Sequence, residues 1–197
     1  MIASESTALS HIIEDLLVAA RADIGTLAIN PERVNVAQAI TELTDPGPAS
    51  VQPSQIAVSS TREVVWADPV RFRQVVRNLI TNARRYGGEY IAVDIERRAD
   101  LVAITVLDDG PGVPDNREQA IFEAYERGHA QSTQPGSVGL GLAVSRELAR
   151  MMGGDLTFER RDSTSRFEFT IPAFAADRPG LDPVPEPASM PASVDAA

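Results

Sequence analysis

The sequence predicts an α+β fold, a two-layer sandwich in which helices cover one face of a mixed β-sheet, preceded by a single N-terminal helix. Short segments in the middle of the chain alternate apolar and polar residues, as half-buried strands do. Longer segments between them repeat apolar residues at spacings of three and four, as amphipathic helices do. With 197 residues, 43% of them hydrophobic, the chain is long enough to form one ordinary domain with a core.

The N-terminal part is expected to hold two helices and a short strand before a natural break. Its first helix, from about residue 5 to 21, ends at Asp23 and Gly25. This helix carries one apolar stripe, made by Leu9, Ile12, Ile13, Leu16, Leu17 and Ala20. The elements that follow are a strand, a helix and a Pro-, Gly- and Ser-rich loop, over residues 27–29, 36–43 and 45–54.

The long helix of the sandwich is expected to begin at Pro69 and run to Tyr86, because Asp68 can cap it and proline is favoured in the first helical position. A hairpin is expected to turn at residues 98–100, and Gly153–Gly154 is expected to stop the last helix. The predicted strands of this part are residues 56–59, 64–66, 90–96, 101–107, 156–160 and 166–171. The remaining predicted elements are two helices and the polar loop between them, over residues 118–124, 140–152 and 127–138.

Composition excludes several classes of function. The chain has no cysteine, which removes disulfides, thiolate nucleophiles and cysteine metal sites, and its two histidines are too far apart in sequence to predict a zinc site. Its formal net charge of −10 argues against a nucleic-acid partner, because phosphate chains would repel it. No apolar run approaches the roughly 18 residues of a membrane span. No signal peptide is expected, because residues 1–10 carry an acid and no basic region.

All 18 basic residues are arginine. Without lysine the chain cannot form a Walker-A phosphate loop or the lysine site of a eukaryotic-type protein kinase, and Schiff-base chemistry is excluded as well. A nucleotide bound here would be held by arginine, asparagine, backbone amides and a metal. The absence of lysine together with abundant alanine is also typical of a GC-rich bacterial genome, and the two interpretations are compatible.

Two of four candidate clusters carry side chains suited to a nucleotide. Asn78 and Asn82 lie four residues apart on the long helix, so they project from one face. A carboxamide oxygen there can complete a Mg²⁺ shell made mostly of phosphate oxygen and water, although a plain polar face is the alternative. Asp108 follows an apolar strand and precedes Gly110 and Gly112. A turn would explain these residues, but an acceptor-only carboxylate there would also select adenine through its N6 amine.

The other two clusters are weak when each is taken alone. IFEAYER, residues 121–127, indicates only an amphipathic helix that ends in arginine. GSVGLGL, residues 136–142, opens a helix, and glycines there expose backbone amides at the positive end of the helix dipole, which is an anion-binding arrangement. Val144 stands where a dinucleotide-binding fingerprint has its third glycine, so that class is not indicated.

Together and in this order, the four clusters resemble the ATP-binding domain of sensor histidine kinases, in the superfamily shared with gyrase-type ATPases and the ninety-kilodalton heat-shock chaperone. RNLITNARRYG resembles the N box, DDGPG the G1 box, IFEAYER the F box and GLGLAVSRELARMMGG the G2 box. ADPVRFRQVV is similar to the segment that leads into the N box. The resemblance covers residues 14–172. It implies a Bergerat-type ATP-binding fold and a cytoplasmic two-component enzyme that moves the γ-phosphoryl of Mg·ATP to a histidine and then to a response regulator.

The resemblance also implies roles for the motif residues. Asn82 would hold Mg²⁺, and Asn78 and Arg127 would be catalytic, Asn78 by supporting the phosphate end and Arg127 by reaching the γ-phosphate. The other expected ATP contacts are Arg85 at phosphate, Tyr86, Asp108, Gly110, Gly112 and Val113 around the adenine, Phe122 as anchor of the lid, and Gly139, Leu140, Gly141 and Leu142 along the phosphates. Val138 departs from the family, which often has threonine or serine there, so one hydroxyl contact is in doubt.

The phosphoacceptor histidine of the family is not found. HIIEDLLVAARADIGTL, residues 11–27, resembles the second helix of the family's dimerisation hairpin, but His11 is followed by Ile12 and Ile13 rather than by acid-leucine-arginine. His11 is therefore expected to be an interface or flanking residue, and His129 to be exposed in the lid. The expected domains are a hairpin remnant, the catalytic domain and a disordered acidic tail, over residues 1–25, 26–172 and 173–197.

Three explanations of the missing histidine stay open: a split kinase that phosphorylates a histidine on another chain, a truncated gene, and a degenerate regulator. The exposed apolar stripe of the first helix would serve as an interaction surface, with a dimer through that helix as one option. We favour transfer to another chain. The alternatives are an ATP-binding regulatory module without phosphotransfer and an anti-sigma-type serine kinase, which lacks the first helix.

Overall fold

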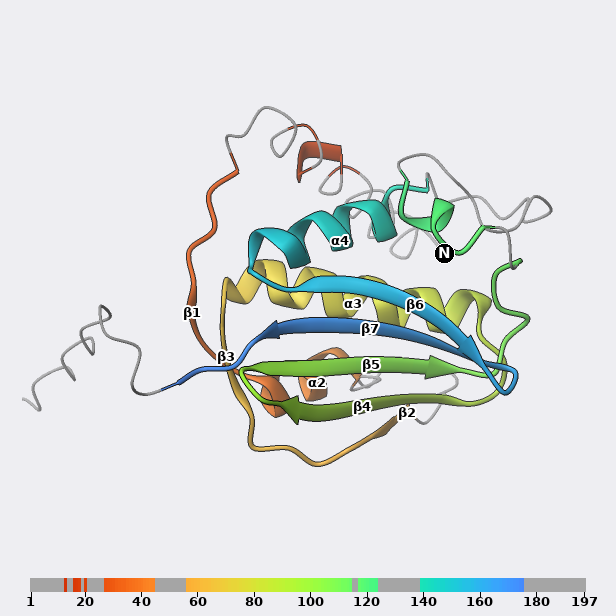
Figure 1. The fold of residues 1–197 in the computed structure, drawn as a ribbon, viewed down its shortest axis with the longest axis horizontal. Coiled ribbons are helices and arrows are strands. Elements are labelled where there is room, and N and C mark those ends of the chain that lie inside the picture. The colour runs from red at the N-terminus through yellow and green to blue at the C-terminus, as the bar shows by residue number, and fades with distance from the viewer. Residues whose placement is uncertain are drawn as a thin grey trace, which may run out of the picture.

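One five-stranded sheet, with strand order β2-β4-β5-β7-β6, forms a layer against which the helices pack (Figure 1). The computed structural model describes residues 13, 16–18, 20, 27–44, 56–114, 117–123 and 139–175. The strands are β1 Glu32–Asn35, β2 Ile56–Val58, β3 Val64–Ala67, β4 Ile91–Arg98, β5 Leu101–Asp108, β6 Asp155–Arg161 and β7 Thr164–Pro172. The helices are α2 Val36–Thr44, α3 Pro69–Tyr86, the 3₁₀ turn η1 Ala120–Phe122 and α4 Gly141–Met151.

The sheet is mixed, because β2 pairs with β4 in parallel whereas the other neighbours are antiparallel. In Figure 1 helices α3 and α4 lie side by side behind it, and the opposite face is open. Strands β1 and β3 form a separate antiparallel pair. The predicted fold class, a mixed sheet with helices on one face, is confirmed.

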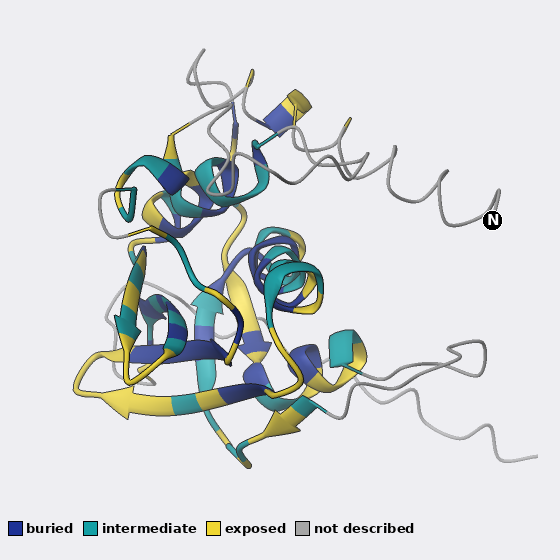
Figure 2. Ribbon diagram, turned by 90° about the vertical axis from the view of Figure 1, so that its right-hand side faces the viewer, coloured by how far each residue is buried: buried dark blue, intermediate teal, exposed yellow. Residues whose placement is uncertain are grey.

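The core lies between the sheet and the helices, where the buried residues gather in Figure 2. Strand β7 shows how the sequence builds it: Phe167, Phe169 and Ile171 are buried, and the residues between them are partly exposed. This alternation places one apolar face of the strand against the helices. Phe72 of α3 meets Phe169 with their ring centroids 5.8 Å apart, so the long helix packs directly on β7.

Helix α3 begins where the sequence predicts, because Asp68 caps it. One carboxylate oxygen of Asp68 accepts hydrogen bonds from the amides of Val70 and Arg71, at 3.0 and 3.1 Å. The other accepts one from the amide of Asn30, at 3.1 Å. Asp68 therefore both starts the helix and joins it to the segment that leads into β1.

Two predicted elements are wrong in extent or place. The strand expected at 27–29 is absent. The strand in this part of the chain is β1 instead, where Val34 stands opposite Val65 of β3. An isolated apolar run cannot become a strand without a partner that takes its backbone hydrogen bonds. Of the helix expected at 118–124, only η1 forms within the described part, since Glu123 is already extended.

The ends of the chain lie largely outside the described residues, and the predicted loops 127–138 and 45–54 lie entirely outside them. Residues 13, 16–18 and 20 are helical; Val18, which is not in the predicted stripe, joins the core, whereas Leu17 is 52% exposed. At the other end the pairing continues into the segment assigned to the tail: Ala173 bridges Val65. None of the helices in the described ranges has the length and apolar content that crossing a bilayer requires.

Replacing Gly154 by alanine is expected to destabilise the fold by about 2–4 kcal/mol. A Cβ atom on Gly154 would collide with the carbonyl oxygen of Thr170 and lie 3.1 Å from the Cα of Ile171, and both are backbone atoms that cannot rotate away. Urea unfolding measures the loss. The matched control is Gly153→Asn, because asparagine tolerates the φ of +83° found there. An unchanged urea midpoint for G154A would contradict the packing.

Candidate functional site

The structure brings three of the four motif clusters of the sequence into contact. They are the C-terminal half of α3, the loop that follows β5, and the start of α4. A Cβ atom on Gly110 of the loop would meet the carbonyl oxygen of Tyr86 and the Cα of Gly87. Asn78 of α3 contacts Gly141 of α4. Helix α3 thus contacts the loop at its C-terminal end and the start of α4 through Asn78.

Asn78 joins the two helices. Its side-chain amide donates to the carbonyl oxygen of Gly141 at 3.3 Å and to the hydroxyl of Ser145 at 3.1 Å. Ser145 is fully buried, so Asn78 holds the first turns of α4 against α3. Asn82, one turn further along α3, is partly buried and has no hydrogen-bond partner among the described residues. The two asparagines, which the spacing places on one face, therefore differ in what they do.

Replacing Asn78 by alanine is expected to cost about 1–2 kcal/mol of stability, because the buried hydroxyl of Ser145 and the partly buried carbonyl of Gly141 lose the hydrogen bonds that Asn78 donates. Urea unfolding measures this loss. The exposed Thr81, on the same helix, gives the control variant T81A, for which a change below about 0.5 kcal/mol is expected. If N78A unfolds at the same urea concentration as T81A, the hydrogen bonds do not contribute to stability.

Asp108 is a buried carboxyl at the end of β5, with 4% of its surface exposed. One of its oxygens accepts a hydrogen bond from the amide of Gly110 at 3.0 Å. Burial raises the pKa of the Asp108 carboxyl above its ordinary value, and the charge of Asp109 adds to this. The Gly110 amide, the Ser165 hydroxyl and the charge of Arg160 act in the opposite direction. A buried acceptor held in this way, beside a loop, is typical of functional sites.

The glycines after Asp108 let the loop lie close to its neighbours. Gly110 packs on the end of α3, where a Cβ atom would meet backbone, and Gly112 has a φ of +71° with the guanidinium of Arg160 against it. Val113 packs on the edge of the core. Tyr86 is partly buried at the end of α3, and the guanidinium of Arg85 lies 6.0 Å from its ring centroid. The loop backbone and the residues Arg85 and Tyr86 therefore lie together at the C-terminal end of α3.

Phe122 is fixed by a residue that sequence reasoning missed. The guanidinium of Arg146 lies 4.8 Å from the Phe122 ring centroid and forms a 3.0 Å ion pair with Asp155 of β6. Burial works to raise the pKa of the Asp155 carboxyl, but hydrogen bonds from Arg146 and the Leu156 amide and the charges of Arg146 and Arg150 hold that pKa below its usual value. Arg146 thereby ties η1, α4 and the sheet together.

The start of α4 offers backbone rather than side chains. Gly139 has a φ of +75°, and Leu140, which precedes the helix, makes no side-chain capping hydrogen bond. The first amides of a helix have no partner within it, so Gly141 and Leu142 lie where amides are available to an anion. Arg127, His129 and Val138 lie outside the described residues, as does His11.

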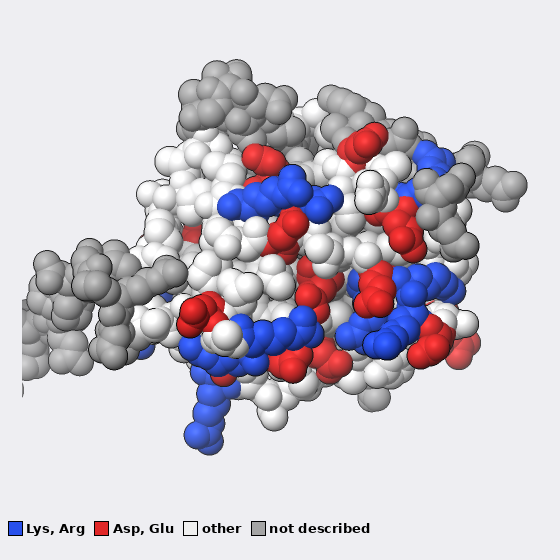
Figure 3. All heavy atoms as spheres, in the orientation of Figure 1, with Lys and Arg blue, Asp and Glu red and all other residues white. Residues whose placement is uncertain are grey.

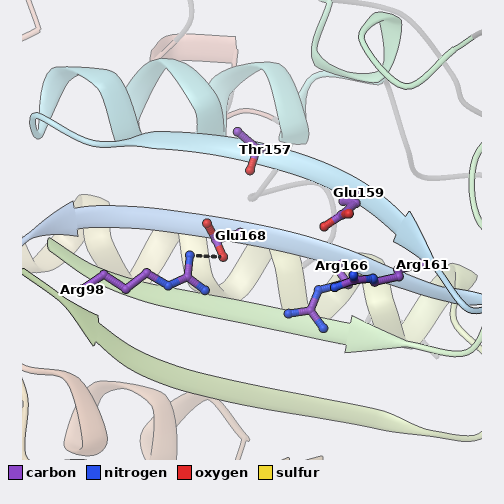
Figure 4. Close-up of a pocket in the computed structure, with 6 residues that line it drawn as sticks. All are labelled: Arg98, Thr157, Glu159, Arg161, Arg166 and Glu168. Atoms are coloured by element: carbon purple, nitrogen blue, oxygen red, sulfur yellow. Dashed lines mark hydrogen bonds and ion pairs between the residues drawn. The ribbon is translucent and has the colours of Figure 1, made fainter.

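A hollow of about 290 Å³ lies elsewhere, on the open face of the sheet (Figure 4). Its lining is Arg98, Thr157, Glu159, Arg161, Arg166 and Glu168. Arg98 and Glu168 form an ion pair at 2.9 Å, and acidic and basic side chains are interspersed across this face (Figure 3). None of the motif residues lines this hollow, so it is separate from the candidate site.

Comparison with known proteins defines the class. The family of histidine kinase-, DNA gyrase B- and HSP90-like ATPases matches residues 67–175, more than half of the chain, and the chain belongs to this family. Within the family, the similar proteins are sensor kinases. The chain is 30% identical to the sensor protein KdpD of Escherichia coli and 31% identical to the histidine-protein kinase AfsQ2 of Streptomyces coelicolor, over 83% and 81% of its length.

The solved structures give the same assignment. The catalytic domain of histidine kinase ThkA is 27% identical, with a TM-score of 0.62 over 73% of this chain and 95% of that one. The chain spans only 19% of KdpD and 29% of AfsQ2, so its match to these relatives is confined to one part of them. The chain therefore contains an ATP-binding domain of the sensor histidine kinase type, and the predicted resemblance is confirmed.

Proposed function

We propose that this chain is the catalytic part of a bacterial two-component kinase, which transfers the γ-phosphoryl of ATP to a histidine on another chain, from which a response regulator receives it. The observation that carries the proposal is that the C-terminal half of α3 contacts both the loop after β5 and the start of α4, with Asp108 buried where α3 meets the loop. The domain extends over residues 26–172 in this proposal, which includes every strand described.

The carboxylate of Asp108 accepts the N6–H of adenine, and Tyr86 lies against the ring. An acceptor-only group favours adenine over guanine, whose O6 it repels. Gly110, Gly112 and Val113 shape the adenine wall, and Arg85 meets phosphate. Phe122 anchors the lid. The amides at the start of α4, from Gly139 to Leu142, bind the phosphates, as helix N-termini do.

Asn82 is the proposed Mg²⁺ ligand. No group of three or more His, Cys, Asp or Glu side chains that could hold a metal occurs among the described residues, so a bound metal would depend on nucleotide oxygens and water. A partly buried carboxamide without another partner in the described ranges fits that need, because Mg²⁺ keeps several waters and takes few protein ligands. When bound, the ion neutralises charge on the phosphates.

Positioning and charge neutralisation supply most of the catalysis, since phosphoryl transfer asks for little covalent chemistry from the protein. The attacking neutral imidazole and the acid that orients it belong to the partner chain. Its nitrogen bonds to the γ-phosphorus as the bond to the β-phosphate oxygen breaks, and ADP leaves. Arg127 is assigned to the γ-phosphate by its place in the motif, and Asn78 holds α4 in position for the amides.

Incubation with γ-labelled ATP, alone and with a partner that carries a histidine hairpin, tests the proposal. Acid-labile, base-stable label on the partner is the expected result, and it should disappear when the partner's histidine is replaced by glutamine. ATP binding without label on any partner would overturn phosphotransfer and favour a regulatory module. Acid-stable label would indicate serine phosphorylation instead.

A further inference from the structure

Asp108, Ser165 and Arg160 lie in one row across three neighbouring strands. Ser165 of β7 stands opposite Asp108 of β5 on one side and opposite Arg160 of β6 on the other. The row lies at the end of the strands where β5 stops and the loop with Gly110 and Gly112 begins. No motif of the sequence includes Arg160, which lies far along the chain from Asp108.

Arg160 forms hydrogen bonds with the backbone of this loop. Its two terminal nitrogens donate to the carbonyl oxygen of Gly110 at 3.2 and 3.3 Å, and one of them also lies 3.4 Å from the hydroxyl of Ser165. A Cβ atom on Gly112 would collide with the guanidinium, so Arg160 in this position lies directly beside that glycine. The amide of Gly110 meanwhile donates to Asp108. Both polar groups of Gly110 are thus engaged, one by Arg160 and the other by Asp108.

We propose that Arg160 is the positioning residue for adenine recognition: by holding the Gly110 carbonyl, it fixes the loop that aims the Asp108 carboxylate at the exocyclic amine. This inference rests on the proposed ATP site. A guanidinium suits the task because its planar fork can bind one carbonyl with two N–H groups and still reach a hydroxyl.

The charge of Arg160 acts in the same direction as its geometry. The groups that face Asp108 are the Gly110 amide, the Ser165 hydroxyl, the Arg160 guanidinium and the Asp109 carboxylate. Burial and Asp109 raise the pKa of Asp108, whereas Arg160 lowers it together with the two hydrogen bonds. Without Arg160 the carboxylate would take up a proton at higher pH, and its power to select a donor would be lost there.

The test compares R160Q with R161Q. The two variants lose the same charge one residue apart, but Arg161 is exposed, lines the hollow on the open face and makes no contact with the loop in the described part. Calorimetric titration with ATP and with GTP, in millimolar Mg²⁺ from pH 5 to 8, is run on both variants and on wild type. R160Q should bind ATP about tenfold more weakly and prefer ATP over GTP by a smaller factor. As the pH is lowered, the ATP affinity of R160Q should begin to fall at a higher pH than the affinity of wild type does.

Each outcome decides the inference. An R160Q protein that matches wild type and R161Q in affinity, preference and pH profile would overturn it, and so would an equal loss of ATP and GTP binding, which indicates a purely structural role. If R160Q shows no cooperative melting transition, R160K replaces it in the test. Because lysine retains the charge, R160K should keep the pH profile of wild type and only part of its ATP affinity. Failure of wild type to bind ATP would instead refute the proposed function.

Discussion

Replacing Asp108 by asparagine is expected to weaken ATP binding by about 100-fold while leaving the fold at least as stable as wild type. The substitution keeps the shape and an oxygen that can accept from the Gly110 amide. It removes the acceptor-only character, because the new NH₂ group faces the adenine N6 amine or leaves it unpaired. Calorimetric titration with ATP measures the first effect, and urea unfolding measures the second.

The stability part follows from the sign of the pKa shift. Because burial raises the pKa of Asp108, the folded state binds a proton more tightly than the unfolded state does. The contribution of this group therefore favours folding at low pH, below the unfolded pKa, and is lost as the pH rises through the raised folded value. At neutral pH the buried charge opposes folding, and asparagine relieves that cost.

ATP binding by wild type should weaken as the pH falls through the raised pKa of Asp108, and D108N should lack this dependence. Asp109→Asn is the matched control, since the Asp109 oxygen accepts from the amide of Tyr90 at 2.9 Å and an asparagine oxygen can do the same. D108N binding ATP with the affinity of D109N would show that the carboxylate does not recognise adenine.

Replacing Asn82 by alanine should abolish labelling of the partner histidine, with a rate at least about 100-fold lower, because charge on the transferring phosphoryl is no longer neutralised by a held ion. Stability should not fall, since Asn82 has no hydrogen-bond partner among the described residues and alanine is the better helix former. The initial rate of labelling at several Mg²⁺ concentrations is the measurement.

The control for N82A is T81A, which changes an exposed neighbour on the same helix. T81A should label the partner at the wild-type rate. Survival of labelling in N82A, with the same Mg²⁺ dependence as in T81A, would show that another group holds the metal. Melting temperatures of both variants exclude unfolding as the cause of a loss.

Local patterns were sufficient for the elements that carry strong signals of their own. Asp68 and Pro69 specify the start of α3, and the alternation along β7 specifies which of its side chains enter the core. Local patterns gave wrong predictions where the structure of a segment depends on another segment that packs or pairs with it. Residues 27–29 are apolar but pair with no strand in the described part of the chain. The described residues around Phe122 form only a 3₁₀ turn, and Arg146 lies over the Phe122 ring.

The family could be predicted because each motif is contiguous and the order of the motifs along the chain is specific. Arg160 and Ser165 could not, since their importance depends on which strands are neighbours in the sheet. Arg146 likewise became visible only when Phe122 and Asp155 were found on either side of it.

By itself, then, the sequence determined the fold class, the order of the helices and strands, and the family. Tertiary structure alone decided which side chains support the candidate site: Asn78 bonds to α4, and Arg160 reaches Gly110 at the end of the sheet. The physical reason is that periodicity and capping act within a few residues, whereas these hydrogen bonds join residues 50 or more positions apart, which only the packed sheet brings together.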